Sequence, residues 1–531
     1  MPAHHMNPVE ACRQAIQVEI DARRSGAERN RLGQFATPNG LAVEIAQYVE
    51  TLLGRKVGGL RFADPSLGSG SFFSAALTVF GRDRIASAIG VELDSEICSA
   101  ARDLWTGAGL EVVHGDFTRV VASSSRPLAP NLILANPPYV RHHHLDREEK
   151  ERLRALTHRM SGVSVNGLAG LYVHFLLLAT AWMKEEGYAA WLIPSEFMDV
   201  NYGAALKRFL TDRVTLLRAH RFHADDVQFG DALVSSVVLV FHKASPPSDH
   251  RVEFTLGGKI AEPRVREAVA LDRLRDSRKW TMYPEHAGND RRISTNRGEP
   301  TFGDLFRIQR GIATGSNKFF VVERAEAAKR RLPKEYLRPI LPSPRYLKTT
   351  VIDADEDGYP LIDPQLCLID CALQERLVET KYPSLWAYLQ TAEPLGIKGG
   401  YLVGKRSPWY RQEQRRPAPF LCTYMGRGTD DKQPFRFIWN RSAAIGTNLY
   451  LMLYPQSGLA ALLRAQPECA AEVHEMLRCV AGHELRGEGR IYGGGLNKIE
   501  PRELARIAAG PFIKRWPQLG SELERQGALY G

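Results

Sequence analysis

Between residues 31 and 245, short apolar runs alternate with helical patterns, and this alternation constrains the fold more than any other feature of the sequence. Apolar runs bounded by turn residues are typical of buried strands, and helices between such runs connect parallel strands. We therefore predict an α/β fold, a doubly wound and mostly parallel seven-stranded sheet with helices on both faces. The expected strands are 60–64, 88–92, 111–114, 132–135, 188–193, 215–221 and 233–241, and the clearest expected helices are 40–53, 73–79, 97–106 and 170–185.

Breaks in this pattern predict the domain organisation. The run Ser-Pro-Pro-Ser-Asp at 245–249 has the composition of a linker. Beyond residue 300 the alternation becomes irregular and turn clusters are frequent. We predict an N-terminal helical extension at 1–30, an α/β domain at 31–245, a connecting segment at 246–300 and a mixed α+β domain at 301–531.

Charge and cysteine usage limit the partners and the compartment. The 531 residues include 70 Lys and Arg against 60 Asp and Glu, and the net charge of +10 favours a polyanionic partner. The seven cysteines include no Cys-x-x-Cys pair, which argues against a disulfide framework. The most apolar stretch, 171–183, is shorter than a membrane span. We expect a cytoplasmic protein with no membrane partner.

The first expected strand leads into a glycine-containing turn. Asp64 and Pro65 end the strand, and Gly68 and Gly70 follow before the next helix. A Gly-x-Gly turn between a strand and a helix lets the backbone approach a nucleotide-like ligand closely, although a plain tight turn has the same pattern. Phe73 occupies the position of the third glycine of dinucleotide-binding proteins, so the pattern argues against a nicotinamide cofactor.

Acidic residues also end the next two expected strands. Glu92 lies 22 positions after Gly70, where a carboxylate suits the hydroxyls of a ribose. Asp116 follows the third strand and can accept from an adenine amino group, while Phe117 can cover the ring face. Each carboxylate alone has a plainer interpretation as a strand-end cap. Together they predict a ligand across the carboxyl ends of the strands.

The fourth expected strand ends in Asn136, Pro137, Pro138 and Tyr139. Asn-Pro is an ordinary turn signal, but two consecutive prolines make the turn rigid and remove two backbone donors. The side-chain oxygen of Asn136 and the carbonyl oxygen of Pro137 can then accept both hydrogens of an aromatic amino group. Tyr139 offers a flat face on which a base can stack. This turn is therefore the predicted catalytic site.

These motifs resemble those of the TaqI-like, gamma-group DNA-adenine amino-methyltransferases of type II restriction-modification systems. The tetrapeptide at 136–139 follows the cofactor motif at 64–70 in the order typical of that group. The segment 33–38, with Thr37 and Pro38, is similar to the family's motif at the methionine end of the cofactor, although Thr37 is also a candidate helix N-cap. The segments 171–175 and 193–197 resemble later family motifs.

The resemblance implies a class I, Rossmann-like methyltransferase that uses S-adenosylmethionine to methylate N6 of a flipped-out adenine in double-stranded DNA. It implies a base-stacking role for Tyr139 and for Phe229, which lies in a segment similar to one that stacks the flipped base. A companion restriction endonuclease is an expected genetic partner. The implied cofactor contacts are Thr37, Pro38, Asp64, Pro65, Gly68, Gly70, Glu92, Asp116, Phe117 and Asn136.

Basic and aromatic residues are interleaved in the second expected domain, a pattern typical of phosphate-binding surfaces. The domain resembles the target-recognition domains of larger type II methylases. Three consecutive histidines at 142–144 cannot all face one ion, and we expect no metal site there. The predicted DNA-binding residues are Arg141, Lys318, Lys405, Arg406, Arg415, Arg416 and Lys498.

Three alternatives remain open from the sequence. N4-cytosine methylation presents a similar exocyclic amine, although Asn at 136 favours adenine in family terms. RNA and protein-glutamine methyltransferases use the same tetrapeptide. A DNA-binding specificity protein without activity would share the second domain but would not need the complete set of motifs.

Overall fold

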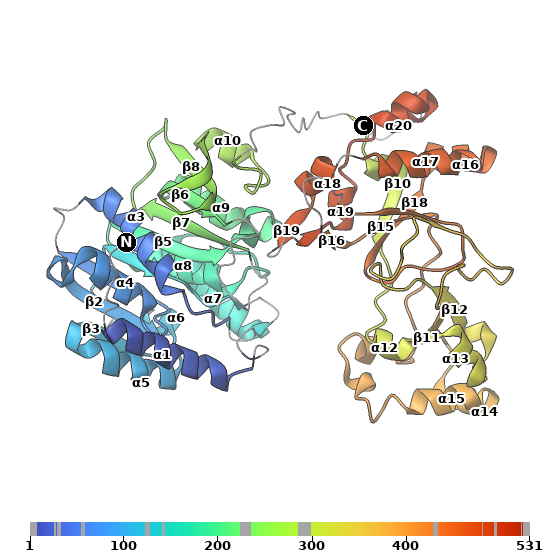
Figure 1. Cartoon of the computed structure of the whole chain (residues 1–531), viewed down its shortest axis with the longest axis horizontal. Helices are drawn as coiled ribbons and strands as arrows, with labels where there is room; N and C mark the ends of the chain where they lie inside the picture. The colour runs from blue at the N-terminus through green and yellow to red at the C-terminus, as the bar shows by residue number, and fades with distance from the viewer. Residues whose placement is uncertain are drawn as a thin grey trace. The chain divides into compact units, whose positions relative to one another are not determined.

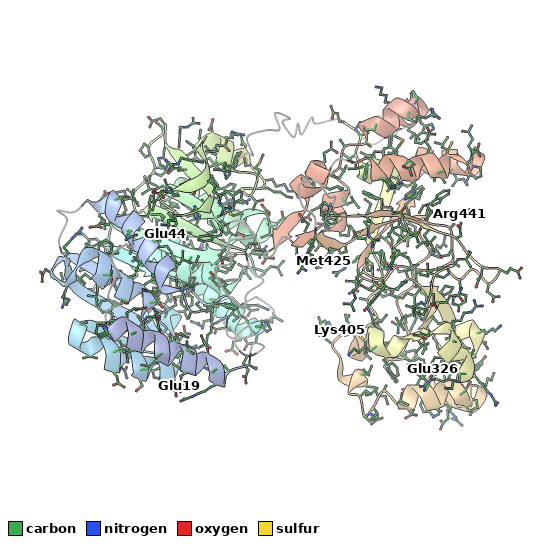
Figure 2. All side chains as sticks on the ribbon, in the orientation of Figure 1. Glu19, Glu44, Glu326, Lys405, Met425 and Arg441 are labelled. Atoms are coloured by element: carbon green, nitrogen blue, oxygen red, sulfur yellow. The ribbon has the colours of Figure 1, made fainter. Side chains whose placement is uncertain are left out.

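The computed structural model divides into two compact units, Met1–Arg291 and Arg292–Gly531, and each unit is described by itself (Figures 1 and 2). The residues that the structure describes are 8–25, 28, 33–54, 59–122, 128–140, 144–222, 235–284, 299–427, 434–480, 482–492, 496–521 and 523.

The first unit is built on one large sheet. Its order is β3-β2-β1-β4-β5-β7-β6-β8-β9, nine strands within the described residues. Strands β1 to β5 run parallel to one another, and β7 runs antiparallel to both β5 and β6. The strands are β1 (Leu60–Asp64), β2 (Ile85–Glu92), β3 (Leu110–His114), β4 (Leu132–Ala135), β5 (Tyr188–Pro194), β6 (Thr215–Arg221), β7 (Ser236–His242), β8 (Arg251–Gly258) and β9 (Pro263–Ala270).

Two parts of the prediction were wrong. The sheet does not end at seven strands, because β8 pairs in parallel with β6 and β9 pairs antiparallel with β8. The segment 246–300 is therefore not a simple connection, since both strands lie within it. The Pro-rich break at 245–249 separates β7 from β8 and marks a loop inside the unit rather than a domain boundary.

Helices cover both faces of this sheet, as Figure 1 shows. One core packs α3 and α4 against residues such as Phe62 and Leu134, and a second core packs α8 and α9 against residues such as Trp191. This two-faced arrangement is that of a doubly wound α/β fold. The helices are α1 (Pro8–Arg23), α3 (Asn39–Leu53), α4 (Ser71–Phe80), α5 (Ser95–Trp105), α6 (Phe117–Val120), α7 (Arg147–Ser161), α8 (Leu171–Trp182), α9 (Ala204–Asp212) and α10 (Leu271–Asp276).

The second unit is mixed α+β. Its described residues form a five-stranded sheet of order β10-β18-β15-β17-β13 and two three-stranded sheets, β11-β14-β12 and β16-β20-β19. The strands are β10 (Phe306–Arg310), β11 (Val321–Glu323), β12 (Leu337–Ile340), β13 (Val351–Ile352), β14 (Leu366–Ile369), β15 (Phe420–Thr423), β16 (Met425–Arg427), β17 (Phe437–Asn440), β18 (Tyr450–Pro455), β19 (Arg490–Tyr492) and β20 (Leu496–Lys498).

Alternate side chains of the five-stranded sheet pack into two separate cores. Leu421 and Met452 belong to one core, whereas Phe420 and Leu453 belong to the other. None of the helices among the described residues has the length and apolar character needed to cross a membrane. The helices of this unit are α11 (Phe302–Leu305), α12 (Asn317–Phe320), α13 (Arg324–Lys329), α14 (Glu375–Lys381), α15 (Pro383–Gln390), α16 (Ser457–Ala465), α17 (Cys469–Arg478), α18 (Gly482–Glu488), α19 (Pro501–Leu504) and α20 (Gly510–Arg515).

Candidate active site

The turn after β4 has its asparagine held in one orientation. The Nδ2 atom of Asn136 donates to the carbonyl oxygen of Phe35 at 2.8 Å and lies 3.1 Å from the hydroxyl of Thr37. A carbonyl oxygen can only accept, so the NH2 group must face Phe35. The Oδ1 atom of Asn136 is buried and has no hydrogen-bond partner among the described residues. Buried polar atoms are nearly always paired, which makes this acceptor a candidate ligand contact.

The backbone of the same turn is tied to the segment 33–38. The amide of Tyr139 donates to the carbonyl oxygen of Gly33 at 3.1 Å. Gly33 has a φ of +65°, and a Cβ atom there would lie only 2.4 Å from the Tyr139 nitrogen. Glycine is therefore required at position 33 by both backbone conformation and space.

Tyr139 is less open than its predicted role suggests. Its side chain is 7% exposed, and its hydroxyl donates to the carbonyl oxygen of Leu192 at 3.2 Å. Its ring lies 5.7 Å from that of Phe35, at an interplanar angle of 44°. Burial raises the pKa of the Tyr139 hydroxyl well above its usual range. Pro137 is buried and Pro138 is half-buried beside it.

The loop after β1 approaches its neighbours closely. Gly70 has a φ of +92°, and a Cβ atom there would lie 2.3 Å from Nε1 of Trp105. The same Nε1 atom donates to the carbonyl oxygen of Ser69 at 2.8 Å. Gly68 also has a positive φ, of +56°, but a Cβ atom there would meet nothing within 4 Å. The loop thus packs tightly at Gly70 and leaves open space beside Gly68.

One buried and one half-buried carboxylate lie at this loop. Asp64, 2% exposed, accepts from the amide of Ser66 at 3.0 Å, and Glu92 accepts from the amides of Gly68 and Asp94 at 2.9 and 2.8 Å. Burial raises the pKa of Asp64 to about 7, and burial also raises the pKa of Glu92. Among the described residues, no ion pair joins either carboxylate to a basic side chain. A cationic or hydroxyl-bearing ligand would offset the free-energy cost of keeping these carboxylates ionised away from water.

The structure places the two predicted residues after β3 in different surroundings. Asp116 caps α6, because its Oδ1 accepts from the amide of Thr118 at 2.8 Å, and its Oδ2 lies 3.6 Å from Arg152. Phe117 is 2% exposed, and its ring packs in the core against Phe175 and Trp182. The proposed cover of an adenine face by Phe117 is therefore wrong for this structure, since an apolar ring facing α8 is stabilised by burial there.

The segment 33–38 provides contacts to Asn136 that its motif did not predict. Thr37 is buried beside Asn136, whereas the N-cap of α3 is Pro38, which makes no side-chain cap. Thr37 is therefore not the helix cap. Phe35 and Ser66 are contacts that the sequence did not single out, and the hydroxyl of Ser66 donates to the carbonyl oxygen of Asn136 at 3.0 Å. Only their positions inside the two motifs could have indicated them.

The predicted basic residues of the second unit fall into three groups. Lys318, Lys405 and Arg416 are exposed. Arg406 is committed to its own fold, since its guanidinium donates to the carbonyl oxygens of Ala313 and Thr314, both at 2.7 Å. Its assignment to a phosphate-binding surface is therefore corrected to a structural role. Two more are ion-paired: Arg415 with Glu413 at 3.2 Å, and Lys498 with Glu500 at 2.9 Å.

Arg141 and Phe229 lie outside the described residues, as do two of the three consecutive histidines. Within the described part of the chain, no group of three or more His, Cys, Asp or Glu side chains is arranged to hold a metal ion.

Similarities to known proteins were found for most of the chain. The family model described as Type II methyltransferase M.Eco57I, C-terminal domain, matches residues 277–524, and the Eco57I restriction-modification methylase model matches residues 131–228. Type II methyltransferase M.XamI of Xanthomonas campestris pv. amaranthicola is 27% identical over 495 residues, which cover 91% of this chain and 86% of that protein. Type II methyltransferase M.AccI of Acinetobacter calcoaceticus is 24% identical over 507 residues, 92% of this chain and 87% of that protein.

Two solved structures are similar over much of the chain. The chain in the cryo-EM structure of the DrdV–DNA complex has a TM-score of 0.51 at 12% identity, over 88% of this chain and 55% of that chain. The type IIG restriction endonuclease BpuSI has a TM-score of 0.44 at 14% identity, over 91% of this chain and 59% of that chain. This chain thus spans little more than half the length of these two proteins. The family models and the two sequence relatives show that the chain is similar to type II restriction-modification methyltransferases over most of its length.

Proposed function

We propose that this protein is a DNA methyltransferase that transfers a methyl group from S-adenosylmethionine to N6 of an adenine. The observation that carries the proposal is the unpartnered, buried Oδ1 atom of Asn136, whose amide is oriented by Phe35. An acceptor fixed in this way is suited to an exocyclic amino hydrogen, because the acceptor needs no reorganisation when the substrate arrives. Similarity to two proteins named as type II methyltransferases supports DNA as the substrate.

The residues around the β1 loop fit the proposed cofactor. Gly68 leaves open space beside the backbone, and the Glu92 carboxylate can accept from ribose hydroxyls in addition to its two amide contacts. Asp64 is buried without an ion pair among the described residues and would be favoured as a carboxylate beside a positively charged ligand. When bound, S-adenosylmethionine supplies an electrophilic methyl group on a positively charged sulfur. Asp116, Pro65, Pro38 and Thr37 remain proposed contacts.

The chain's own residues would position the acceptor nitrogen. Asn136 Oδ1 and the Pro137 carbonyl oxygen accept the two amino hydrogens, which directs the nitrogen lone pair away from them. Tyr139 and Phe229 would hold the base by stacking. A target base inside a duplex is out of reach of such a turn, so the adenine must be flipped out of the helix. Catalysis then rests mainly on positioning.

The second unit would recognise the DNA target. The exposed Lys318, Lys405 and Arg416, together with Arg141, are the proposed phosphate contacts. The relatives are named as type II methyltransferases, which supports protection against a companion restriction endonuclease as the biological role. The order of motifs supports the TaqI-like gamma group. N4 of cytosine is the second candidate target, because its exocyclic amine would fit the same acceptor.

One experiment separates these possibilities. The full chain is incubated with isotopically labelled S-adenosylmethionine and with duplex DNA, RNA or a bacterial protein extract in parallel. Labelled products are digested and identified by mass spectrometry. We expect N6-methyladenine from the DNA reaction alone. Labelled N4-methylcytosine would replace the adenine proposal, and label confined to RNA or protein would overturn the DNA proposal.

A further inference from the structure

Helix α1 contacts several segments of the proposed cofactor site. In the N-terminal half of the helix, Arg13 donates to the hydroxyl of Ser69 at 2.8 Å and pairs at 2.7 Å with Glu10 of the first turn. The Arg13 and Glu10 side chains are 3% and 5% exposed, and Glu10 also accepts from the hydroxyl of Ser74 at 2.5 Å. The loop between Gly68 and Gly70 is thus tied to α1 by the hydrogen bond from Arg13 to Ser69. The buried ion pair between Arg13 and Glu10 holds this arginine in place, and loss of either partner would leave an uncompensated charge.

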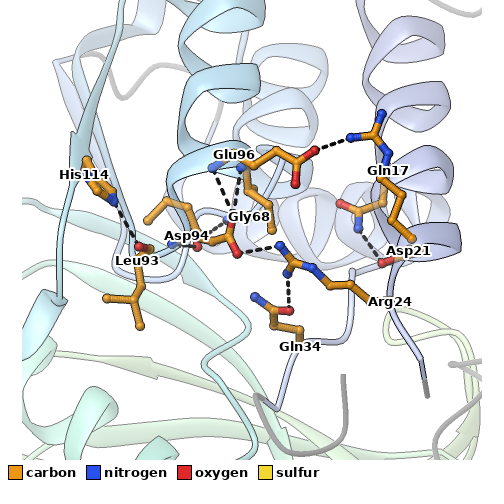
Figure 3. A network of polar contacts seen from close by, with 12 residues as sticks. Gln17, Asp21, Arg24, Gln34, Gly68, Leu93, Asp94, Glu96 and His114 are labelled. Atoms are coloured by element: carbon orange, nitrogen blue, oxygen red, sulfur yellow. Dashed lines mark hydrogen bonds and ion pairs between the residues drawn. The ribbon is translucent and has the colours of Figure 1, made fainter. Parts of the chain in front are cut away.

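A second arginine follows the other end of the helix. Arg24 donates through Nη2 to Oδ2 of Asp94 and through Nη1 to Oε1 of Gln34, both at 2.6 Å. Figure 3 shows the Arg24 side chain between these two partners. The Arg24 and Asp94 side chains are 18% and 22% exposed, so water screens this pair less than a surface pair.

Both partners of Arg24 lie next to proposed site residues. The backbone amide of Asp94 donates to Glu92, the proposed ribose contact. Gln34 stands between Gly33, which holds the backbone of Tyr139, and Phe35, which holds the side chain of Asn136. Arg24 therefore connects the ribose side of the proposed site to the segment that orients the catalytic turn.

We propose that Arg24 is a positioning residue, which sets the spacing between the Asp94 loop and the Gln34 segment that S-adenosylmethionine must span. The inference rests on the proposed function. A guanidinium is rigid and planar, so its two terminal nitrogens fix the separation of the two oxygen atoms that they contact. Lysine carries one compact charge and cannot hold both partners at that separation.

A neighbouring residue provides a matched control. Arg23 also lies at the end of α1 and pairs with Glu96 of α5 at 2.5 Å and with Glu19. Its side chain is 58% exposed, and Glu96 is 49% exposed. Exposed ion pairs of this kind contribute little to stability. Arg23→Ala therefore removes a positive charge from the same end of the helix and leaves the contacts of Arg24 with Asp94 and Gln34 intact.

The test compares Arg24→Ala, Arg24→Lys and Arg23→Ala in the full chain by calorimetric titration. Each protein is titrated with S-adenosylmethionine, S-adenosylhomocysteine and adenosine, and its thermal unfolding is recorded without ligand. For Arg24→Ala we expect S-adenosylmethionine and S-adenosylhomocysteine, which reach both sides of the proposed site, to bind on the order of tenfold more weakly. An effect of this size is typical of energetic coupling between two sites. Adenosine reaches only the ribose side of the proposed site. Its dissociation constant in Arg24→Ala should therefore lie within about twofold of the wild-type value.

The remaining outcomes decide the inference. Arg24→Lys should bind the longer ligands with intermediate affinity, and Arg23→Ala should match wild type for all three. Equal loss of adenosine and of the longer ligands in Arg24→Ala would indicate that Arg24 only stabilises the fold and would overturn the proposal. Full recovery with lysine, or unchanged binding by Arg24→Ala, would also overturn it. Failure of the wild-type protein to bind any of the ligands would instead refute the proposed function.

Discussion

The carbonyl oxygen of Phe35 accepts a 2.8 Å hydrogen bond from the side-chain nitrogen of Asn136, across 101 positions of the chain. This contact decides which end of the Asn136 amide is committed within the protein and which remains available. Because Nδ2 is used, Oδ1 is the atom left buried without a partner among the described residues.

Removing the side-chain amide tests the catalytic role of the turn. Asn136→Ala removes the proposed acceptor but keeps Tyr139, so DNA and cofactor binding should persist while turnover falls on the order of a hundredfold or more. Single-turnover kinetics with labelled cofactor measure the effect. The control is Asn166→Ala, because Asn166 is exposed and its side chain only caps a turn at Leu168. A normal rate in Asn136→Ala would show that the turn has only a structural role.

A pair of glycines tests the close approach of the segment 33–38. Gly33→Ala places a Cβ atom 2.4 Å from the Tyr139 nitrogen at a φ of +65°, which should lower both turnover and thermal stability. The left-handed backbone alone costs about 1–2 kcal/mol for a residue with a side chain. Gly40→Ala in α3 is the matched control, because its Cβ atom would meet nothing within 4 Å. The control should be as stable as wild type or slightly more so, and equal behaviour of the two variants would contradict the close approach.

The buried carboxyl of Asp64 makes stability and cofactor binding depend on pH in opposite directions. Burial raises its pKa to about 7, so without ligand its contribution to stability is complete below its usual pKa of 3.8 and is lost as the pH rises through about 7. The difference in the free energy of unfolding between Asp64→Asn and wild type should therefore shift in favour of the variant from pH 4 to pH 8. Chemical denaturation at both pH values measures this difference.

A positively charged ligand has the reverse preference, because it favours the ionised carboxyl of Asp64. S-adenosylmethionine should bind wild type most tightly above pH 7 and lose up to about tenfold in affinity per pH unit below it. The affinity of Asp64→Asn should be lower and nearly independent of pH in this range. Calorimetry in buffers of different ionisation enthalpy should also detect proton release on binding near pH 7. A flat pH profile in wild type would remove Asp64 from the cofactor site.

Adjacent basic residues in the second unit should behave differently. Lys405 is exposed and contacts the hydroxyl of Tyr401, whereas Arg406 donates to two backbone carbonyls. Lys405→Ala should weaken DNA binding and reduce the slope of log affinity against log salt by about one, as for a lost phosphate contact. Arg406→Ala should instead lower the melting temperature, because buried acceptors lose their donor. An unchanged salt slope in Lys405→Ala would exclude it from the phosphate-binding surface.

The sequence by itself determined the main strands and the order of the motifs along the sheet. Strands 60–64, 132–135 and 215–221 were predicted with the bounds that the structure shows, because an apolar run between turn residues is a local signal. The positions of Asp64, Glu92 and Asn136 at strand ends followed from the same signal. Parallel strands then bring their carboxyl ends to one edge of the sheet.

Tertiary structure alone decided which distant segments meet. The addition of β8 to the sheet depends on parallel pairing with β6, and the Phe117 ring packs in the core. The contacts of Asn136 with Phe35 and of Arg24 with Asp94 join residues 101 and 70 positions apart. Hydrophobic periodicity reports which face of an element is buried, but it carries no information about the partner that covers that face. Those partners are set by how the elements pack in three dimensions, which only the folded chain shows.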